Sequence, residues 1–152
     1  MHDSALNEQD RRFCDIMQRI DRLYEKYAKS KGMTYMSMTV LECVVENEND
    51  CTQKLICEHT HYPKQSVNLI IRSFWEEGYV TLEELSSDRR NKRIVLTDKG
   101  RGYAAETVGG QWDIDRAAAL RLSDKQREEL LHLLTIYADA YEDGVLRALE
   151  QK

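Results

Sequence analysis

Two short β-like runs interrupt a chain whose other segments follow helical periodicity, and this interruption limits the folds that are possible. The runs cover residues 79–85 and 93–97 and are rich in Val, Ile, Tyr, Leu and Thr. The seven residues between them, Ser-Ser-Asp-Arg-Arg-Asn-Lys, are too polar for a core and fit the tip of a hairpin. The sequence therefore predicts a mainly α fold with one small antiparallel β hairpin.

The segment before the hairpin predicts two helices joined by a short turn. Thr52 can cap a short helix that reaches about His59. Pro63 suits the first position of the next helix, because its missing N–H would have no helical partner there. That helix runs to Glu77, and Gly78 can end it in the left-handed conformation. Two such helices followed by a hairpin form a winged helix-turn-helix.

Amphipathic helices are predicted on both sides of this motif. Apolar residues recur at steps of three and four over about Asp10–Ser30, and Thr34 can cap a second helix. After Asp98 the chain turns helical again, with a kink expected at Gly109–Gly110 because paired glycines weaken a helix. Ser123–Gln126 reads as a capping box at the start of a last helix with a continuous apolar stripe.

Length and composition exclude several classes of protein. The 152 residues are about one domain, and no stretch approaches the roughly 20 apolar residues of a membrane span. The first residues lack the basic and apolar regions of a signal peptide, which predicts a cytoplasmic protein. There is no Gly-rich phosphate loop and no nucleophile elbow, so we expect neither an enzyme nor a cofactor.

The four cysteines indicate reduced thiols, some of them in the core, because they form no C-x-x-C pair. A zinc site is the alternative, since Cys51, Cys57, His59 and His61 fall within eleven residues. The two thiols are six positions apart, however, and would flank a helical turn rather than clasp a metal. The sequence therefore favours the absence of a metal site.

Basic side chains concentrate around the predicted hairpin tip. Residues 88–101 carry six basic and two acidic side chains, in a chain whose 22 basic and 27 acidic residues sum to −5. Such a cluster favours nucleic acid, because each Lys or Arg that neutralises a phosphate releases condensed counterions. Asp88 can hold Arg90 by charge-assisted hydrogen bonds and aim it at a narrow minor groove. The candidates for phosphate contacts are Arg89, Lys92 and Arg93. A solvated basic turn is the alternative.

The second helix of the motif is polar over its first turn and a half and apolar later. This asymmetry fits a helix that enters the major groove by its N-terminal end, where Gln and Asn can bond adenine edges. Ordinary solvent exposure is the alternative interpretation. The candidate DNA-contacting residues of this helix are Lys64, Gln65, Ser66, Asn68 and Arg72.

Two segments carry a resemblance to a known family. They are Val-Asn-Leu-Ile-Ile-Arg-Ser-Phe-Trp-Glu-Glu-Gly-Tyr-Val at residues 67–80 and Asp-Arg-Arg-Asn-Lys-Arg-Ile-Val-Leu-Thr-Asp-Lys-Gly at residues 88–100. They resemble the recognition helix, the Asp-x-Arg wing tip and the Leu-Thr-x-x-Gly junction of the MarR (multiple-antibiotic-resistance-regulator) family. Trp75 departs from the pattern, since the family usually has a polar residue there.

The resemblance implies one MarR-like unit over residues 1–152. Residues 34–100 would be the winged DNA-binding lobe, and residues 1–33 and 101–152 would be helices that interlock in a homodimer. The dimer would read a pseudo-palindrome in double-stranded DNA, with half-sites roughly 34 Å apart. Its function would be that of a sequence-specific transcriptional regulator, and we expect a repressor.

The resemblance also implies release from DNA by a small, often phenolic molecule. A peroxide-sensing regulator is an alternative, because Cys14 lies in the first helix and Tyr35 stands near the start of the second. Asp15 beside Cys14 would oppose formation of the thiolate. A winged-helix module that binds another protein, without DNA, is the second alternative, although such a module needs no basic tip.

Overall fold

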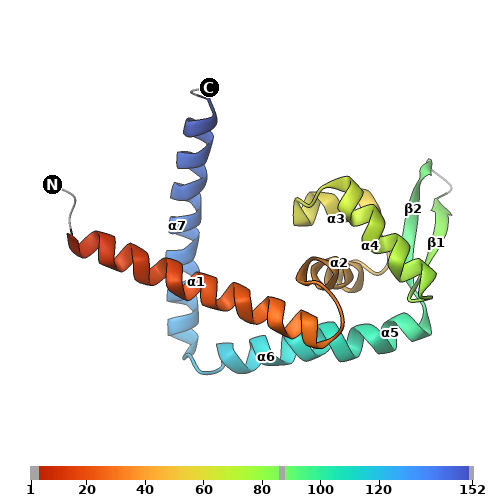
Figure 1. Cartoon of the computed structure of the whole chain (residues 1–152), viewed down its shortest axis with the longest axis horizontal. Coiled ribbons are helices and arrows are strands. Elements are labelled where there is room, and N and C mark those ends of the chain that lie inside the picture. The colour runs from red at the N-terminus through yellow and green to blue at the C-terminus, as the bar shows by residue number, and fades with distance from the viewer. Residues whose placement is uncertain (1–3, 86–87, 151–152) are drawn as a thin grey trace. The chain divides into compact units, whose positions relative to one another are not determined.

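A computed structural model of the chain describes residues 4–85 and 88–150, apart from the side chains at positions 4, 85 and 88–91. It is mainly helical with one two-stranded antiparallel sheet (Figure 1), which confirms the predicted fold class. The chain forms two compact units, one up to Gln111 and the other from Trp112. Within the described ranges, no helix is both long enough and apolar enough to cross a membrane. The elements are α1 (Ser4–Ser30), α2 (Tyr35–Glu46), α3 (Gln53–Thr60), α4 (Lys64–Glu76), β1 (Val80–Leu85), β2 (Asp88–Leu96), α5 (Asp98–Ala104), the π-helical turn η1 (Ala105–Gly109), α6 (Gly110–Ala119) and α7 (Asp124–Glu150).

The first helix is longer than its apolar pattern predicts. It begins at Ser4 instead of about Asp10 and ends at Ser30, as expected. The added residues are mostly polar, and Glu8 among them forms an ion pair with Arg11, 3.3 Å away and one turn further along the helix. Polar turns of this kind give no apolar periodicity, which explains the missed start.

The threonine caps that the sequence predicts for α2 and α3 are confirmed. The Thr34 hydroxyl accepts a hydrogen bond from the Ser37 N–H at 3.0 Å, and the Thr52 hydroxyl accepts one from the Leu55 N–H at 3.2 Å. α3 ends at Thr60, and its C-cap residue His61 has a φ of 55° and so adopts the left-handed conformation. These caps fix where the two helices start and where the turn between α3 and α4 begins.

Pro63 lies just before α4 instead of occupying its first helical position. Its ψ of 136° is extended, so Pro63 is the N-cap and Lys64 is the first helical residue. The C-terminal end follows the prediction, because Gly78 has a φ of 75° and the Tyr79 N–H donates back to the Phe74 carbonyl at 2.8 Å. α4 thus covers the segment that the sequence predicts, except that it starts one residue later and ends one residue earlier, at Glu76.

The predicted seven-residue hairpin tip is wrong, because strand pairing extends into it. The ladder runs regularly from Val80 opposite Leu96 to Glu84 opposite Lys92, then shifts so that Leu85 pairs with Asp88. The second strand therefore begins at Asp88 and not near residue 93. Opposite charges face each other at Glu84 and Lys92, which favours continued pairing. Ser86 and Ser87 of the predicted tip lie outside the described residues.

Thr97 ties the base of the hairpin to the end of α4 and the start of α5. Its hydroxyl donates to the Gly78 carbonyl at 2.7 Å and accepts from the Gly100 N–H at 2.9 Å. Its own N–H donates to the Tyr79 carbonyl at 3.0 Å. Gly100 lies so close to that carbonyl that a Cβ atom there would overlap it. We call these four residues, Gly78, Tyr79, Thr97 and Gly100, the Thr97 junction.

A single apolar core holds the winged lobe together, and α2 is its centre. α2 packs against α3 and α4 and against the second strand of the hairpin. α4 buries one face, with Val67, Ile71 and Phe74, whereas the buried residues of α2 lie around most of that helix, in keeping with its central place. The largest fully buried side chains of this lobe are Met38, Val40, Leu41, Val44, Ile56, Val67, Val80 and Ile94.

The irregularity expected at Gly109–Gly110 takes the form of a π-helical turn just before it. η1 covers Ala105–Gly109, and the helix continues beyond it as α6. The Tyr27 hydroxyl of α1 donates to the Thr107 carbonyl at 3.0 Å and lies against Gly110, where a Cβ atom would collide with it. A π turn therefore gives Tyr27 both a hydrogen-bond acceptor and the space that it fills.

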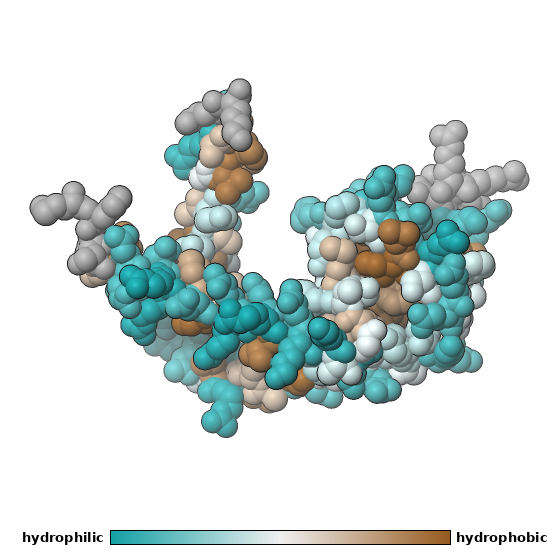
Figure 2. All heavy atoms as spheres, in the orientation of Figure 1, coloured by the Kyte–Doolittle hydropathy of each residue, from teal (hydrophilic) through white to brown (hydrophobic). Residues whose placement is uncertain are grey.

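The last helix begins with the capping box that the sequence predicts. The Ser123 N–H donates to Gln126 Oε1 at 2.9 Å, and the Gln126 N–H donates to the Ser123 hydroxyl at 3.3 Å. Along α7 the described side chains include no buried one, although many are apolar (Figure 2). The exposed residues of its predicted apolar stripe are Leu130, Leu134, Tyr137, Tyr141 and Val145.

The Thr97 junction predicts opposite outcomes for two glycines of α5. Gly100→Ala should lower the free energy of unfolding by about 1–3 kcal/mol, because the new methyl group overlaps the Tyr79 carbonyl. Gly102→Ala is the matched control: nothing lies within 4 Å of its Cβ position, so stability should stay level or rise by up to about 1 kcal/mol. Urea denaturation of both variants measures the difference, and equal midpoints would contradict the close contact between Gly100 and the Tyr79 carbonyl.

Candidate nucleic-acid interface

α4 presents most of the predicted contact residues on one solvent-facing surface. Val67, Ile71 and Phe74 of this helix are buried in the core, which fixes its rotation about its own axis. The opposite face is therefore exposed along the length of the helix. Of the predicted contact residues, Lys64, Gln65, Asn68 and Arg72 are exposed, and Ser66 is half-buried.

The N-terminal end of α4 is held in place but keeps its first N–H groups available. The Gln53 side-chain amide of α3 donates to the Lys64 carbonyl at 2.9 Å, which ties the two helices of the motif together. Pro63 has no side-chain oxygen to cap the helix, and no described side chain does so in its place. Such a terminus, with unpaired N–H groups and the positive end of the helix dipole, attracts an anion.

Two of the predicted DNA-contacting arginines form ion pairs within the lobe. Arg93 Nη2 lies 2.5 Å from Glu83 Oε2, directly across the ladder, and Arg93 Nη1 donates to the Asn49 carbonyl at 3.3 Å. The hydrogen bond that Arg93 donates to the Glu83 carboxylate raises the pKa of Arg93 above its ordinary value. Arg72 Nε lies 2.8 Å from Glu76 Oε1, one turn further along α4. Both guanidinium groups are held in place by a carboxylate.

The remaining predicted wing residues differ in what the structure describes. Lys92 is exposed on the second strand, opposite Glu84. The backbone of Asp88, Arg89 and Arg90 lies in the second strand, where the register shifts. The side chains of these three residues lie outside the described part of the structure, so the aiming of Arg90 by Asp88 stays a prediction.

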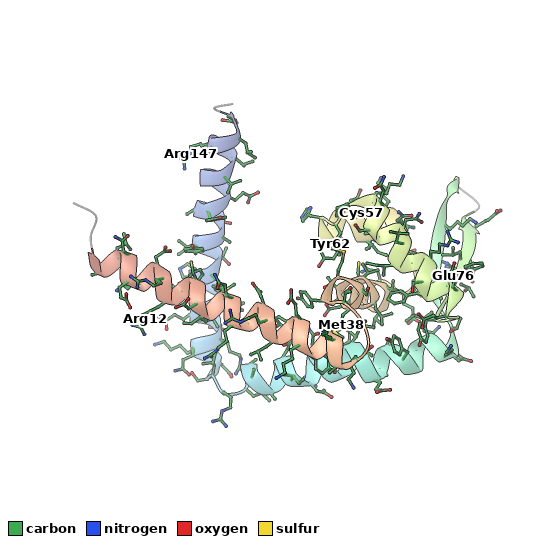
Figure 3. The ribbon with its side chains drawn as sticks, in the orientation of Figure 1. Arg12, Met38, Cys57, Tyr62, Glu76 and Arg147 are labelled. Carbon is green, nitrogen blue, oxygen red and sulfur yellow. The ribbon has the colours of Figure 1, made fainter. Side chains whose placement is uncertain are left out.

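Two apolar side chains of α4 are exposed, Trp75 and Leu69, and only Trp75 departs from the family pattern in the sequence. Trp75 is 53% exposed in the last turn, close to Glu76, which Figure 3 labels. Leu69 is 66% exposed in the middle of the polar face. Its position four residues after Gln65 could have identified it, because residues at that spacing share one helix face.

Comparison with known proteins identifies the winged lobe. Residues 31–91 match the model of the MarR family, a segment that includes α2, α3, α4 and most of the hairpin. The winged lobe is therefore similar to proteins of the MarR family. No curated protein matches the chain.

Solved structures of MarR-family proteins share the fold over nearly the whole chain. A regulator from Neisseria meningitidis has 24% identity and a TM-score of 0.75, with 91% of this chain and 97% of that chain covered. A regulator from Streptomyces coelicolor, solved in complex with DNA, has 18% identity and a TM-score of 0.75 over 92% and 90% of the two chains. The MarR protein of Staphylococcus aureus, solved with salicylate and kanamycin, has 17% identity and a TM-score of 0.71 over 91% and 93%.

The thiols of the chain differ in accessibility. Cys14, the redox candidate, is exposed on α1, whereas Cys43 and Cys51 are buried. Burial raises the pKa of Cys51 to about 12, so this thiol is protonated at neutral pH and is a poor nucleophile. Tyr35 stacks on Tyr24 with ring centroids 5.3 Å apart, and burial raises its pKa.

The residues of the discarded zinc alternative do not share one environment. Cys51 is buried and Cys57 half-buried, whereas His59 and His61 are exposed. Figure 3 shows Cys57 on α3 and Tyr62 in the connection to α4. Among the residues that the structure describes, no three His, Cys, Asp or Glu side chains gather in an arrangement that could hold a metal ion.

Proposed function

We propose that this protein is a sequence-specific DNA-binding transcriptional repressor that acts as a homodimer. The observation that carries the proposal is the exposed face of α4, where hydrogen-bonding side chains surround an uncapped helix terminus beside a basic hairpin. Double-stranded DNA fits both features, because base edges can hydrogen-bond with the side chains, and phosphates can bind the N–H groups and the cations.

In this proposal α4 enters the major groove by its N-terminal end. Gln65 and Asn68 read base edges, and Lys64 bonds guanine or a phosphate, together with the N–H groups of the first turn. The Arg72 guanidinium, held at Nε by Glu76, turns its other nitrogens towards the DNA. Ser66 is half-buried and is assigned to the helix-start contacts with phosphate.

In this proposal the hairpin of β1 and β2, the wing, contacts the flanking minor groove and its phosphates. Arg90, supported by Asp88, is the proposed minor-groove arginine, and Arg89 and Lys92 are the proposed phosphate contacts. Arg93 has a smaller direct role than the sequence suggests, because its guanidinium is bonded to Glu83 and to the Asn49 carbonyl. It stiffens the hairpin that carries the other basic residues.

The release signal proposed for this regulator is a small molecule. The Staphylococcus aureus relative solved with salicylate shares this fold, which supports a ligand of similar, phenolic chemistry. Oxidation of Cys14 is the second candidate signal, favoured by the exposure of this thiol on α1. Treatment of the DNA complex with an organic hydroperoxide separates the two, since release through Cys14 should be absent in Cys14→Ser.

Selection of genomic DNA fragments by the purified protein tests the proposed function. The wild type should enrich a pseudo-palindrome, and Arg90→Ala should bind it more weakly by roughly 1–3 kcal/mol. No enrichment by a folded dimer would overturn the proposal in favour of a protein partner. Full affinity of a folded Arg90→Ala variant would remove the minor-groove role of the wing.

The apolar stripe of α7 predicts self-association. Leu130, Tyr137 and Tyr141 are exposed on this helix, and apolar surface of that extent favours an interface. Sedimentation equilibrium should give twice the chain mass for the wild type, and Tyr137→Glu should shift the protein towards monomer because it places a charge in the interface. Asp139→Lys, a charge change on the same helix, is the control and should remain dimeric. A monomeric wild type would contradict the prediction.

The ion pair of Arg93 predicts which cations contribute to the salt dependence of DNA binding. Lys64→Gln should reduce the slope of log K against log salt concentration by about 0.9 for each protomer, because one phosphate contact is lost. Arg93→Gln should change the slope less, since Glu83 already neutralises this charge. Fluorescence anisotropy over a salt series measures both slopes. A larger effect for Arg93→Gln than for Lys64→Gln would contradict the assignment.

A further inference from the structure

Leu69 stands out on the face of α4 that is proposed to meet DNA. It is the more exposed of the two large apolar side chains exposed on this helix, at 66% against 53% for Trp75. Figure 2 shows apolar atoms over α4 among hydrophilic neighbours. The core does not use this side chain, since Val67, Ile71 and Phe74 supply the buried face.

The position of Leu69 places it at the centre of the polar face. It lies four residues after Gln65 and three before Arg72, so helical geometry brings all three side chains to one surface. The two turns from Gln65 to Arg72 span about 10 Å, which covers about three base pairs at 3.4 Å each. DNA that meets both Gln65 and Arg72 therefore covers Leu69 as well. Trp75 lies on the flank of this face, in the last turn of the helix.

The chemistry of the major groove limits what Leu69 can meet there. Base edges present hydrogen-bond donors and acceptors, and the C5-methyl of thymine is the apolar group among them. If the isobutyl group covered a donor or acceptor, that group would lose water without gaining a hydrogen bond, which is unfavourable. Against a thymine methyl the same contact buries apolar surface on both sides and is favourable.

We propose that Leu69 is a specificity-determining residue that packs against the C5-methyl of one thymine in each half-site. This inference rests on the proposed DNA-binding function and adds to it the base that one side chain selects. Gln65 and Asn68 select by hydrogen bonds, whereas Leu69 selects by shape and apolar contact. The half-site therefore contains a thymine within the three base pairs that the middle of α4 covers.

Replacement of thymine by deoxyuridine tests the proposal, because it removes only the C5-methyl. Each thymine of the selected operator is replaced in turn, symmetrically in both half-sites, and affinity is measured by fluorescence anisotropy. The proteins compared are the wild type, Leu69→Ala, Leu69→Met and Trp75→Ala. Leu69→Ala should fold normally, since the side chain is exposed and Ala is the better helix former. Thermal melting checks this.

At one thymine position, removal of the methyl group should weaken wild-type binding by about fourfold per half-site. This is the value expected for one buried carbon. The same replacement should have no effect on Leu69→Ala. It should still weaken Leu69→Met, which keeps an apolar side chain, and Trp75→Ala, which changes an apolar residue off the central face.

Two results would overturn the inference while leaving DNA binding intact. One is an operator in which no thymine is sensitive to loss of its methyl group. The other is a methyl effect of the same size in Leu69→Ala as in the wild type. Failure of the proposed function looks different, because no operator would then be selected by the folded wild type, and both proposals would fall together.

Discussion

The winged lobe depends on the close approach of Gly100 to the Tyr79 carbonyl. That contact allows Thr97 to hydrogen-bond both the residue after α4 and the first turn of α5. Thr97 therefore fixes the orientation of α4, the hairpin and α5 relative to one another. Tyr79 also stacks on Tyr103, with ring centroids 4.2 Å apart. Because α4 and the hairpin share this anchor, the proposed major-groove and minor-groove contacts hold a fixed relation to each other.

Carboxylates shape the basic surface as much as the cations do. The chain is acidic overall, with a net charge of −5, yet four of its cations lie in the hairpin and two lie on α4. Glu83 and Glu76 each hold an arginine of that surface, which lowers the local charge but orders the side chains before binding. Ordered side chains lose less entropy when they meet a ligand. The surface is therefore better suited to specific binding of one ligand than to non-specific attraction of any polyanion.

Local chemistry made some features predictable and left others hidden. The threonine caps, Gly78 and the Ser123 capping box were readable because each depends on a few neighbouring residues. The hairpin register was not, since the pairing of Glu84 with Lys92 depends on the opposite strand. The same holds for Arg93, whose partner Glu83 lies ten residues away, and for the π turn, whose cause is Tyr27 on α1.

The π turn has a consequence for how this chain is aligned with its relatives. A π turn accommodates one residue more than a regular helix of the same length, and it persists here because Tyr27 bonds the Thr107 carbonyl and fills the space over Gly110. A homologue with an unbroken helix would lack that residue. Sequence comparison should therefore open a one-residue gap between Ala105 and Gly109, and the presence of both Tyr27 and Gly110 marks the homologues in which the gap should close.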